Sequence, residues 1–167
     1  MSKYNIAVVG ATGAVGQEII DILEERNFPV GKLKLIASKK SEGKKISFLD
    51  KKIEVESIKK GIFDDIDIAL FSIASDLSKK FAPQAVREGA VVIDNSNAFR
   101  MDEDVPLVVP EINANKINEH QGIIANPNCS TIQLVMAIKP IFKKYGLKRV
   151  IVNTYQAVSG TGKKAIS

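Results

Sequence analysis

Cysteine, histidine and tryptophan are scarce in this sequence of 167 residues, which has one cysteine (Cys129), one histidine (His120) and no tryptophan. A single cysteine cannot form an internal disulfide, which is typical of a protein from a reducing compartment. Long apolar runs are also absent, and none approaches the roughly 20 residues that span a bilayer. Residues 1–5 lead directly into an apolar run and lack the regions of a signal peptide. We therefore expect a cytoplasmic protein with no membrane partner.

The charged residues leave a moderate net charge of +5. The densest positive stretch is residues 39–52, which contain Lys39, Lys40, Lys44, Lys45, Lys51 and Lys52. Aromatic residues do not alternate with these lysines, as a surface that stacks nucleic-acid bases requires. We therefore expect no nucleic-acid partner, and phosphate on a small molecule is an alternative ligand for the lysines.

The sequence begins with the pattern strand, glycine-rich turn, helix. Branched apolar residues from Tyr4 to Val9 indicate a buried parallel strand. A turn with glycines at 10, 13 and 16 follows, and apolar residues at helical spacing continue to about Asn27. Such glycines let the backbone approach a pyrophosphate, and a helix N-terminus offers N–H donors to it. The spacing is G-x-x-G-x-x-G, and close packing alone could explain it, but we favour a dinucleotide site.

The end of the next expected strand, residues 33–37, indicates which dinucleotide binds. A carboxylate at this point would bind the ribose hydroxyls of NAD. The chain instead continues Ser38-Lys39-Lys40-Ser41-Glu42-Gly43-Lys44. Lysines and hydroxyls attract a 2′-phosphate, which a carboxylate would repel, so the segment favours NADP over NAD.

The rest of the sequence alternates short apolar runs with helical patterns, which predicts an α/β fold. We expect a Rossmann-like, mostly parallel sheet with helices on both faces. Further strands are expected at residues 46–48 and 53–55 (a small hairpin), 67–72, 90–94, 107–109, 123–125 and 150–158. Helices are expected at residues 75–88, capped by Ser75 or Asp76, at 131–145, and from about 159 onward.

The only cysteine lies at an expected junction of strand and helix, in Asn126-Pro127-Asn128-Cys129-Ser130-Thr131. The N–H groups and dipole of a helix start favour negative charge, and the thiolate is the reactive form of cysteine. A lone cysteine is more often a small buried hydrophobe, so this position alone does not establish a nucleophile.

Five segments together resemble the N-terminal part of the aspartate-semialdehyde dehydrogenases, and the resemblance covers essentially all 167 residues. The segments, in family order, are residues 10–16, Ser38 to Lys44, Asp94-Asn95-Ser96 with Arg100, residues 126–131, and Gln156-Ala157-Val158-Ser159-Gly160. The resemblance implies two domains. Residues 1–131 would form an NADP-binding domain that carries Cys129, and residues 132–167 would begin a substrate and dimerisation domain.

The resemblance also assigns roles to single residues. Cys129 would be the nucleophile, oriented by Asn128, while Gln156 would hold the substrate. Asn95 and Arg100 would bind substrate or phosphate, and no metal is expected. The cofactor would be NADP, bound by Gly10, Thr12, Gly13, Ala14, Val15, Ser38, Lys40, Ser41, Ser72, Ser159 and Gly160.

The implied reaction interconverts aspartyl 4-phosphate and aspartate 4-semialdehyde through a thioester on cysteine, using NADPH and releasing phosphate. The family's general-base histidine matches no position here, because His120 lies in a surface-like turn outside the motifs. Since the sequence also stops where a helix is expected to begin, we expect the front part of a longer protein, inactive alone. The full-length protein would be a homodimer or homotetramer.

Two other interpretations remain open. One is an enzyme of the N-acetylglutamyl-phosphate reductase type, which the run 128–131 fits less well. The other is a non-catalytic nucleotide-binding domain, which explains the glycine turn but gives no role to Arg100, Cys129 or Gln156.

Overall fold

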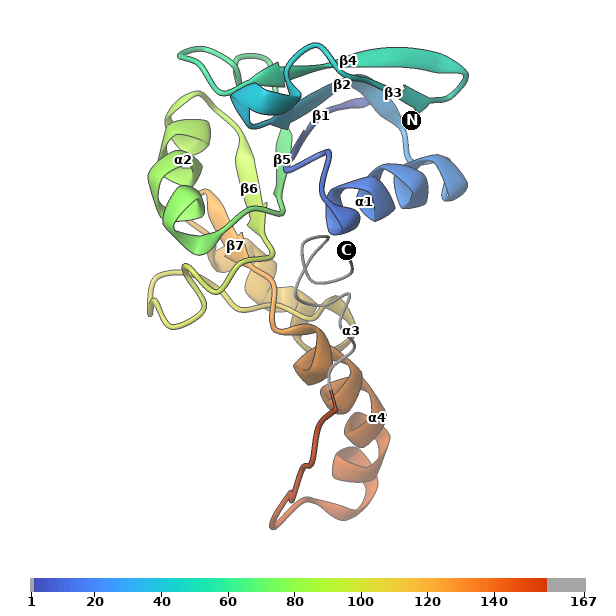
Figure 1. Ribbon diagram of the computed structural model, residues 1–167. Coiled ribbons are helices and arrows are strands. Elements are labelled where there is room, and N and C mark those ends of the chain that lie inside the picture. Colours follow the sequence, from blue (N-terminus) through green and yellow to red (C-terminus); the bar gives the residue numbers. More distant parts are fainter. Residues whose placement is uncertain (1, 156–167) are drawn as a thin grey trace.

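The protein is built on one seven-stranded sheet, seen in the computed structural model, which describes residues 2–155 (Figure 1). The strand order is β3-β4-β2-β1-β5-β6-β7. Every neighbouring pair is parallel except β3 and β4, which are antiparallel. The strands are β1 Tyr4–Val9, β2 Val30–Ala37, β3 Lys45–Phe48, β4 Lys51–Ser57, β5 Ile68–Phe71, β6 Val91–Asp94 and β7 Ile123–Ala125.

Helices cover both faces of this sheet, as the alternation along β1 demonstrates. Ile6 and Val8 point to one face and belong to the same core cluster as Ile20 of α1. Ala7 and Val9 point to the other face, where Ala82 and Ala85 of α2 pack. The predicted α/β, Rossmann-like fold is therefore confirmed. The helices are α1 Ala14–Glu25, α2 Ser75–Arg87, α3 Pro110–Asn113 and α4 Cys129–Tyr145, with 3-10 turns η1 Lys39–Ser41 and η2 Ala114–Glu119.

The winding direction of the chain reverses beside β1. From β1 the chain adds β2 and β4 on one side, and then crosses back to add β5, β6 and β7 on the other. In open parallel sheets, ligands bind where the order reverses, outside the carboxyl ends of the strands. The segments after β1, β2, β4 and β5 are therefore the part of the fold that should form a binding site.

Several sequence expectations need correction. The hairpin at β3 and β4 forms, but β4 also pairs in parallel with β2 and so joins the main sheet. Of residues 107–109, Leu107 makes only an isolated bridge to Ala125. The N-cap of α2 is Ala74, because the hydroxyl of Ser75 bonds the side chain of Asn97 instead of a helix N–H.

The prediction of a strand at residues 150–158 is wrong for residues 150–155, the part that the structure describes. Residues 150–155 adopt no regular structure, and Ile151 and Tyr155 are 80% and 98% exposed. An apolar, β-branched run becomes a strand only when another strand accepts its hydrogen bonds, and no described strand lies against it. The helix expected from about residue 159 lies outside the described residues.

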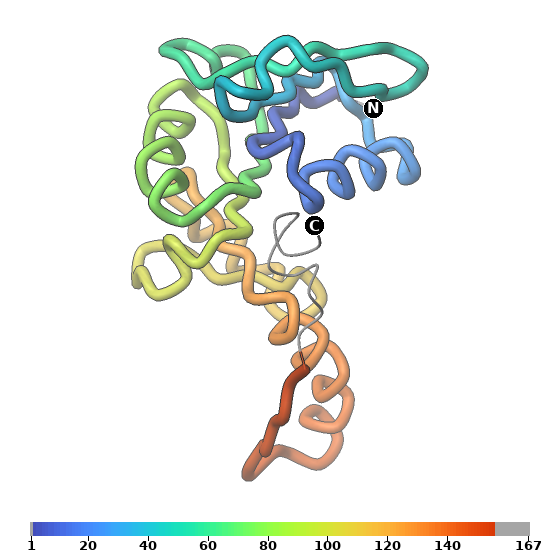
Figure 2. The backbone as a smooth tube through the Cα atoms, in the orientation of Figure 1, coloured from blue at the N-terminus to red at the C-terminus, as the bar shows by residue number. Residues whose placement is uncertain are grey.

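The helix α4 projects away from the sheet, and the segment after it returns alongside it (Figures 1 and 2). None of the side chains of α4 is buried, although the sequence of this helix is rich in apolar residues. Phe142 and Tyr145 are 61% and 74% exposed. No helix in residues 2–155 is long and apolar enough to cross a membrane. Met136 and Ile141 of α4 are exposed as well, so the described part of the chain carries an apolar surface on this helix.

Glu88, at the end of α2, fastens the loop before β5 to that helix. Its carboxylate accepts hydrogen bonds from the backbone N–H groups of Gly61 and Phe63, each at 2.9 Å, and from the amide of Gln84, also at 2.9 Å. Partial burial acts to raise the pKa of Glu88, but these donors outweigh it and hold the pKa below its usual value.

We predict that Glu88→Gln destabilises the protein by about 1–2 kcal/mol at pH 7, because the charged acceptor of two backbone donors is lost. A carboxyl whose pKa is lowered by folding contributes stability above its unfolded pKa, near 4.5, and loses it as pH falls through the folded value. The difference in the free energy of unfolding between Glu88→Gln and the parent, measured with urea, should therefore be smaller at about pH 3 than at pH 7. An equal difference at both values would contradict this role.

Candidate functional site

The glycine turn after β1 is compact because two of its glycines leave no room for a side chain. Gly10 has a φ of +94°, and a Cβ there would lie 2.2 Å from the carbonyl oxygen of Ser72. A Cβ on Gly16 would lie 2.1 Å from the carbonyl oxygen of Gly10. The first turn of α1 thus packs directly on the end of β1, and the amide of Gln17 further holds the turn by donating to the carbonyl of Ala11 at 2.6 Å.

We predict that Gly16→Ala destabilises the protein by about 1–3 kcal/mol or more, because the added methyl group meets backbone that cannot move aside. Gly13→Ala is the matched control. A Cβ at Gly13 has its closest contact at 3.2 Å, so this variant should lose less than about 1 kcal/mol. Urea unfolding of both variants measures their losses in free energy of unfolding. Equal losses would show that the turn does not depend on the close approach of Gly16 to the carbonyl of Gly10.

The start of α1 is suited to an anion. Gly13 is the N-cap residue, and no side chain among the described residues caps the helix. The first turn of α1 contains no acidic residue. Unsatisfied N–H groups and the positive end of the helix dipole therefore face the glycine turn, as in phosphate-binding sites.

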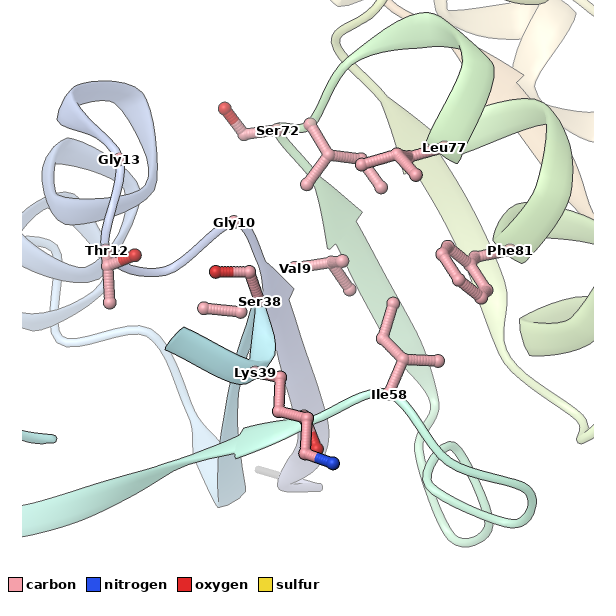
Figure 3. Close-up of a pocket in the computed structure, with 13 residues that line it drawn as sticks. Val9, Gly10, Thr12, Gly13, Ser38, Lys39, Ile58, Ser72, Leu77 and Phe81 are labelled. Atoms are coloured by element: carbon pink, nitrogen blue, oxygen red, sulfur yellow. The ribbon is translucent and has the colours of Figure 1, made fainter. Parts of the chain in front are cut away.

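A cavity of about 470 Å³ opens beside this turn, at the carboxyl ends of β1, β2, β4 and β5 (Figure 3). One part of its wall is backbone of Gly10 and Gly13 and the hydroxyl groups of serine and threonine. The other part is apolar. The polar residues are Thr12, Ser38, Ser57 and Ser72, and the large apolar ones are Val9, Ile58, Ile73, Leu77 and Phe81. This combination suits a nucleotide, with its phosphates at the glycine turn and its base against the apolar wall.

The turn after β2 directs its residues in different directions. Ser41 is nearly buried, and its hydroxyl lies 3.4 Å from that of Thr12. Lys39 and Lys40 are both exposed, and Lys39 lines the cavity while Lys40 does not. The resemblance to a family motif assigns Lys40 to the 2′-phosphate, and this assignment stays a prediction.

A second cavity, of about 550 Å³, lies on the other side of the glycine turn. Ala14, Val15 and Glu18 of α1 form one wall. The other wall is formed by Asn95, Arg100, Asn126, Pro127, Asn128, Cys129 and Ile132. The start of α1 therefore lies between the two cavities, and it brings the expected cofactor residues next to the expected nucleophile.

Cys129 is the first residue of α4 and is exposed at this second cavity. The N-cap residue is Asn128, whose side-chain oxygen accepts a hydrogen bond of 3.0 Å from the N–H of Ser130. The same oxygen lies 4.0 Å from the Sγ atom of Cys129. The alternative that Cys129 is a small buried hydrophobe is therefore wrong, and its thiol is exposed at the first residue of a helix.

Arg100 is fixed by backbone carbonyl groups. Its Nε donates to the carbonyl of Asn126 at 2.9 Å, and one terminal nitrogen donates to the carbonyl of Asn95 at 2.8 Å. No carboxylate in residues 2–155 forms a salt bridge with it, so its charge is not neutralised. A guanidinium has five N–H donors, and three are left for a ligand.

Asp94 supports the loop that carries Asn95 and Arg100. It is fully buried at the end of β6 and accepts three hydrogen bonds. The donors are the hydroxyl of Ser78 at 2.8 Å, the hydroxyl of Ser96 at 2.6 Å and the N–H of Ser96 at 3.2 Å. The Asp94 carboxylate thus joins β6, α2 and the loop.

Not every expected site residue lies within the part of the chain that the structure describes. Gln156, Ser159 and Gly160 lie outside the described residues. His120 lines neither cavity, and its Nδ1 accepts a hydrogen bond of 2.9 Å from the N–H of Gly122. Within the described part of the chain, no cluster of histidine, cysteine and carboxylate side chains could hold a metal ion.

Comparisons with known proteins agree with this geometry. Residues 5–120 match the family model "Semialdehyde dehydrogenase, NAD binding domain", and residues 138–167 match "Semialdehyde dehydrogenase, dimerisation domain". An aspartate-semialdehyde dehydrogenase of Aquifex aeolicus is 57% identical over 166 residues, which are 98% of this chain and 49% of that protein. This chain spans about half the length of the curated relatives it matches.

Solved structures support the same relationship. Aspartate semialdehyde dehydrogenase II from Vibrio cholerae, complexed with ASA, superposes with a TM-score of 0.96 at 49% identity, over 99% of this chain and 50% of that one. The Candida albicans enzyme with NADP gives a TM-score of 0.70 at 26% identity, over 87% and 48%. The resemblance inferred from the five motifs is thus confirmed, and the chain belongs to the semialdehyde dehydrogenase family.

Proposed function

We propose that this chain forms the cofactor-binding and nucleophile-bearing half of an NADP-dependent aspartate-semialdehyde dehydrogenase. The reaction would interconvert aspartate 4-semialdehyde, phosphate and NADP with aspartyl 4-phosphate and NADPH, on the route to lysine, threonine and methionine. The observation that carries the proposal is the start of α1, which contributes Gly13 to one cavity and Ala14 and Val15 to the cavity of Cys129.

The residues at the first cavity fit the adenosine and phosphate parts of NADP. Gly10 and Gly13 leave the backbone open to a pyrophosphate, and the uncapped start of α1 offers N–H donors to it. The ribose and its 2′-phosphate would lie at the turn of Ser38, Lys40 and Ser41, with Thr12 and Ser72 beside it. Val15, Ser159 and Gly160 would contact the nicotinamide half, which exchanges the hydride.

The protein's own part of the chemistry is carried by Cys129. In the direction of aspartyl phosphate, its thiolate adds to the aldehyde carbon, and loss of hydride leaves an aspartyl thioester on Sγ. Phosphate then attacks the thioester carbon, the C–S bond breaks, and the thiolate is regenerated. Asn128 would orient the thiol, and Gln156 would hold the substrate.

Arg100 is suited to the phosphate that enters or leaves. Its two bonds to carbonyls fix the plane of the guanidinium, and three N–H donors with a full positive charge are left to contact an anion. The amide of Asn126 bonds the side chain of Asn95 at 2.5 Å, so the side chain of Asn95 is also held at this wall. We assign Asn95 and Arg100 to substrate and phosphate.

The remaining half of the site would come from a second domain of the kind that the relatives carry. No histidine among the described residues lines the cavity of Cys129, so the general base would lie in that half. We propose that the complete protein is a homodimer or homotetramer, joined in part through the exposed apolar side of α4. A cytoplasmic location also belongs to the proposal, since a reducing compartment keeps a free cysteine thiol from forming disulfides.

The test is to fuse this chain to the remaining half of the Aquifex aeolicus relative and to measure phosphate-dependent NADPH formation. Turnover with aspartate semialdehyde is expected, with negligible turnover by the 167 residues alone. A preference for N-acetylglutamate semialdehyde would favour the related reductase instead. NADP binding without turnover on either aldehyde would favour a non-catalytic domain.

A further inference from the structure

Two asparagines follow neighbouring strands at the wall of the second cavity. Asn95 comes directly after β6, and Asn126 comes directly after β7. Because Asp94 and Ala125 are partners in the parallel pairing of these strands, Asn95 and Asn126 leave the sheet side by side. The backbone N–H of Asn126 continues the ladder by donating to the carbonyl of Asp94 at 2.9 Å. Both asparagines line the cavity of Cys129.

The hydrogen bond between the two side chains fixes the orientation of the Asn95 amide. The Nδ2 of Asn126 donates to the Oδ1 of Asn95 at 2.5 Å. An amide side chain has an oxygen that accepts and an NH2 group that donates, and these lie on opposite sides of the group. Within residues 2–155, the NH2 group of Asn95 has no hydrogen-bond partner. With its oxygen turned toward Asn126, Asn95 therefore offers donors to a ligand in the cavity.

The guanidinium of Arg100 is bound to the backbone of the same two residues. It donates to the carbonyl of Asn126 at 2.9 Å and to the carbonyl of Asn95 at 2.8 Å. Its three remaining N–H donors and the NH2 group of Asn95 therefore belong to one wall of the cavity. Several donors and one positive charge suit an anion such as phosphate, whereas an amide oxygen facing the same anion would repel it.

We propose that Asn126 is a positioning residue for the phosphate of the proposed reaction, because its side chain turns the donor end of Asn95 toward the anion. The inference rests on the proposed function and adds a residue to which the family resemblance assigns no role. Without the donor of Asn126, the oxygen of Asn95 is free to turn toward the positive charge of Arg100, and both residues then offer fewer donors to the anion. Arg100 uses only the backbone of Asn126, so a change of that side chain leaves the guanidinium anchored.

The experiment measures the KM for phosphate in the fused enzyme, with aspartate semialdehyde and NADP at saturation. Asn126→Leu removes the donor but keeps the size of the side chain, and it should raise the KM about fivefold while kcat changes less than about twofold. Asn95→Leu removes the oriented donor itself and should raise the KM about tenfold, the loss expected for one hydrogen bond to a charged ligand. Asn97→Ala is the control and should change the KM less than about twofold. Asn97 lies in the same loop, bonds the hydroxyl of Ser75 and lines neither cavity.

The double variant distinguishes positioning from a general structural effect. If Asn126 acts through Asn95, adding Asn126→Leu to Asn95→Leu should raise the KM by less than about a further twofold. The same rise in both backgrounds, or no rise in either, would overturn the inference and leave the proposed function standing. Asn126→Ser, whose hydroxyl is too short to reach the oxygen of Asn95, repeats the test if the leucine variant does not fold. If the folded parent fusion forms no NADPH from aspartate semialdehyde and phosphate, the proposed function fails, and the inference fails with it.

Discussion

Replacing Cys129 by alanine is expected to lower turnover of the fused, full-length protein by at least about a thousandfold, because the thioester path then has no nucleophile. The side chain is exposed at the second cavity, so the fold should not depend on it. Binding of NADP should be unchanged, since the first cavity does not include Cys129. The measurement is the rate of phosphate-dependent NADPH formation, compared with cofactor affinity in the same preparation.

Ser130→Ala provides the matched control for this prediction. Ser130 occupies the next position of α4, and its only hydrogen bond to a side chain within residues 2–155 is from its backbone N–H to Asn128. The turnover of the Ser130→Ala protein should stay within a few fold of the turnover of the parent. A Cys129→Ala protein that keeps more than a tenth of the parent rate would rule out covalent catalysis at this residue.

Asp94→Ala is expected to have the largest effect on stability, about 2–4 kcal/mol, because three donors lose a buried acceptor at once. Ser78→Ala removes only one of the three bonds and should cost about 1 kcal/mol. Urea unfolding at pH 7 gives both values.

A second measurement distinguishes support of the site from general stability. The loop that Asp94 holds carries Arg100, so Asp94→Ala should also weaken the response of the fused enzyme to phosphate, at temperatures where the protein stays folded. If stability falls but the KM for phosphate does not change, Asp94 supports only the core. If neither changes, the buried network has no role.

The local elements could be predicted from the sequence because their signals are local. The run from Tyr4 to Val9 is β1 at the predicted bounds, and the helical periodicity after the glycine turn corresponds to α1. The junction near Cys129 is predictable for a similar reason, since an apolar helical run follows it. The helix α4 nevertheless begins at Cys129, with Asn128 as its N-cap, and not at residue 131 as expected. Such features depend on the neighbouring residues alone.

The features that the sequence could not supply depend on contacts between distant segments. Ser57 and Ile58 line the first cavity because β4 joins the main sheet beside β2, and a hairpin pattern does not indicate that pairing. The phase of the short turn η1 decides that Lys39 and not Lys40 reaches the wall. The run at residues 150–155 has strand-like composition but no partner strand among the described residues.

The bonds that fix Arg100 are another such feature. Arg100 donates them to the backbone carbonyl groups of Asn95 and Asn126. Every residue type has such a carbonyl group, so the identity of these two residues does not predict the contacts. The motif indicates that an arginine is present, but only the fold shows that its guanidinium is anchored and still carries three open donors.

The role of Cys129 as nucleophile is tested most directly by intact-mass measurement of the fused protein after mixing with aspartate semialdehyde and NADP in the absence of phosphate. Hydride loss then leaves the thioester without its second substrate, so we predict a mass increase of one aspartyl group, accompanied by formation of NADPH. Peptide mapping should place the added mass on Cys129, and adding phosphate should remove it. NADPH formation without an adduct, or an adduct on another residue, would contradict the assignment of Cys129 as the nucleophile.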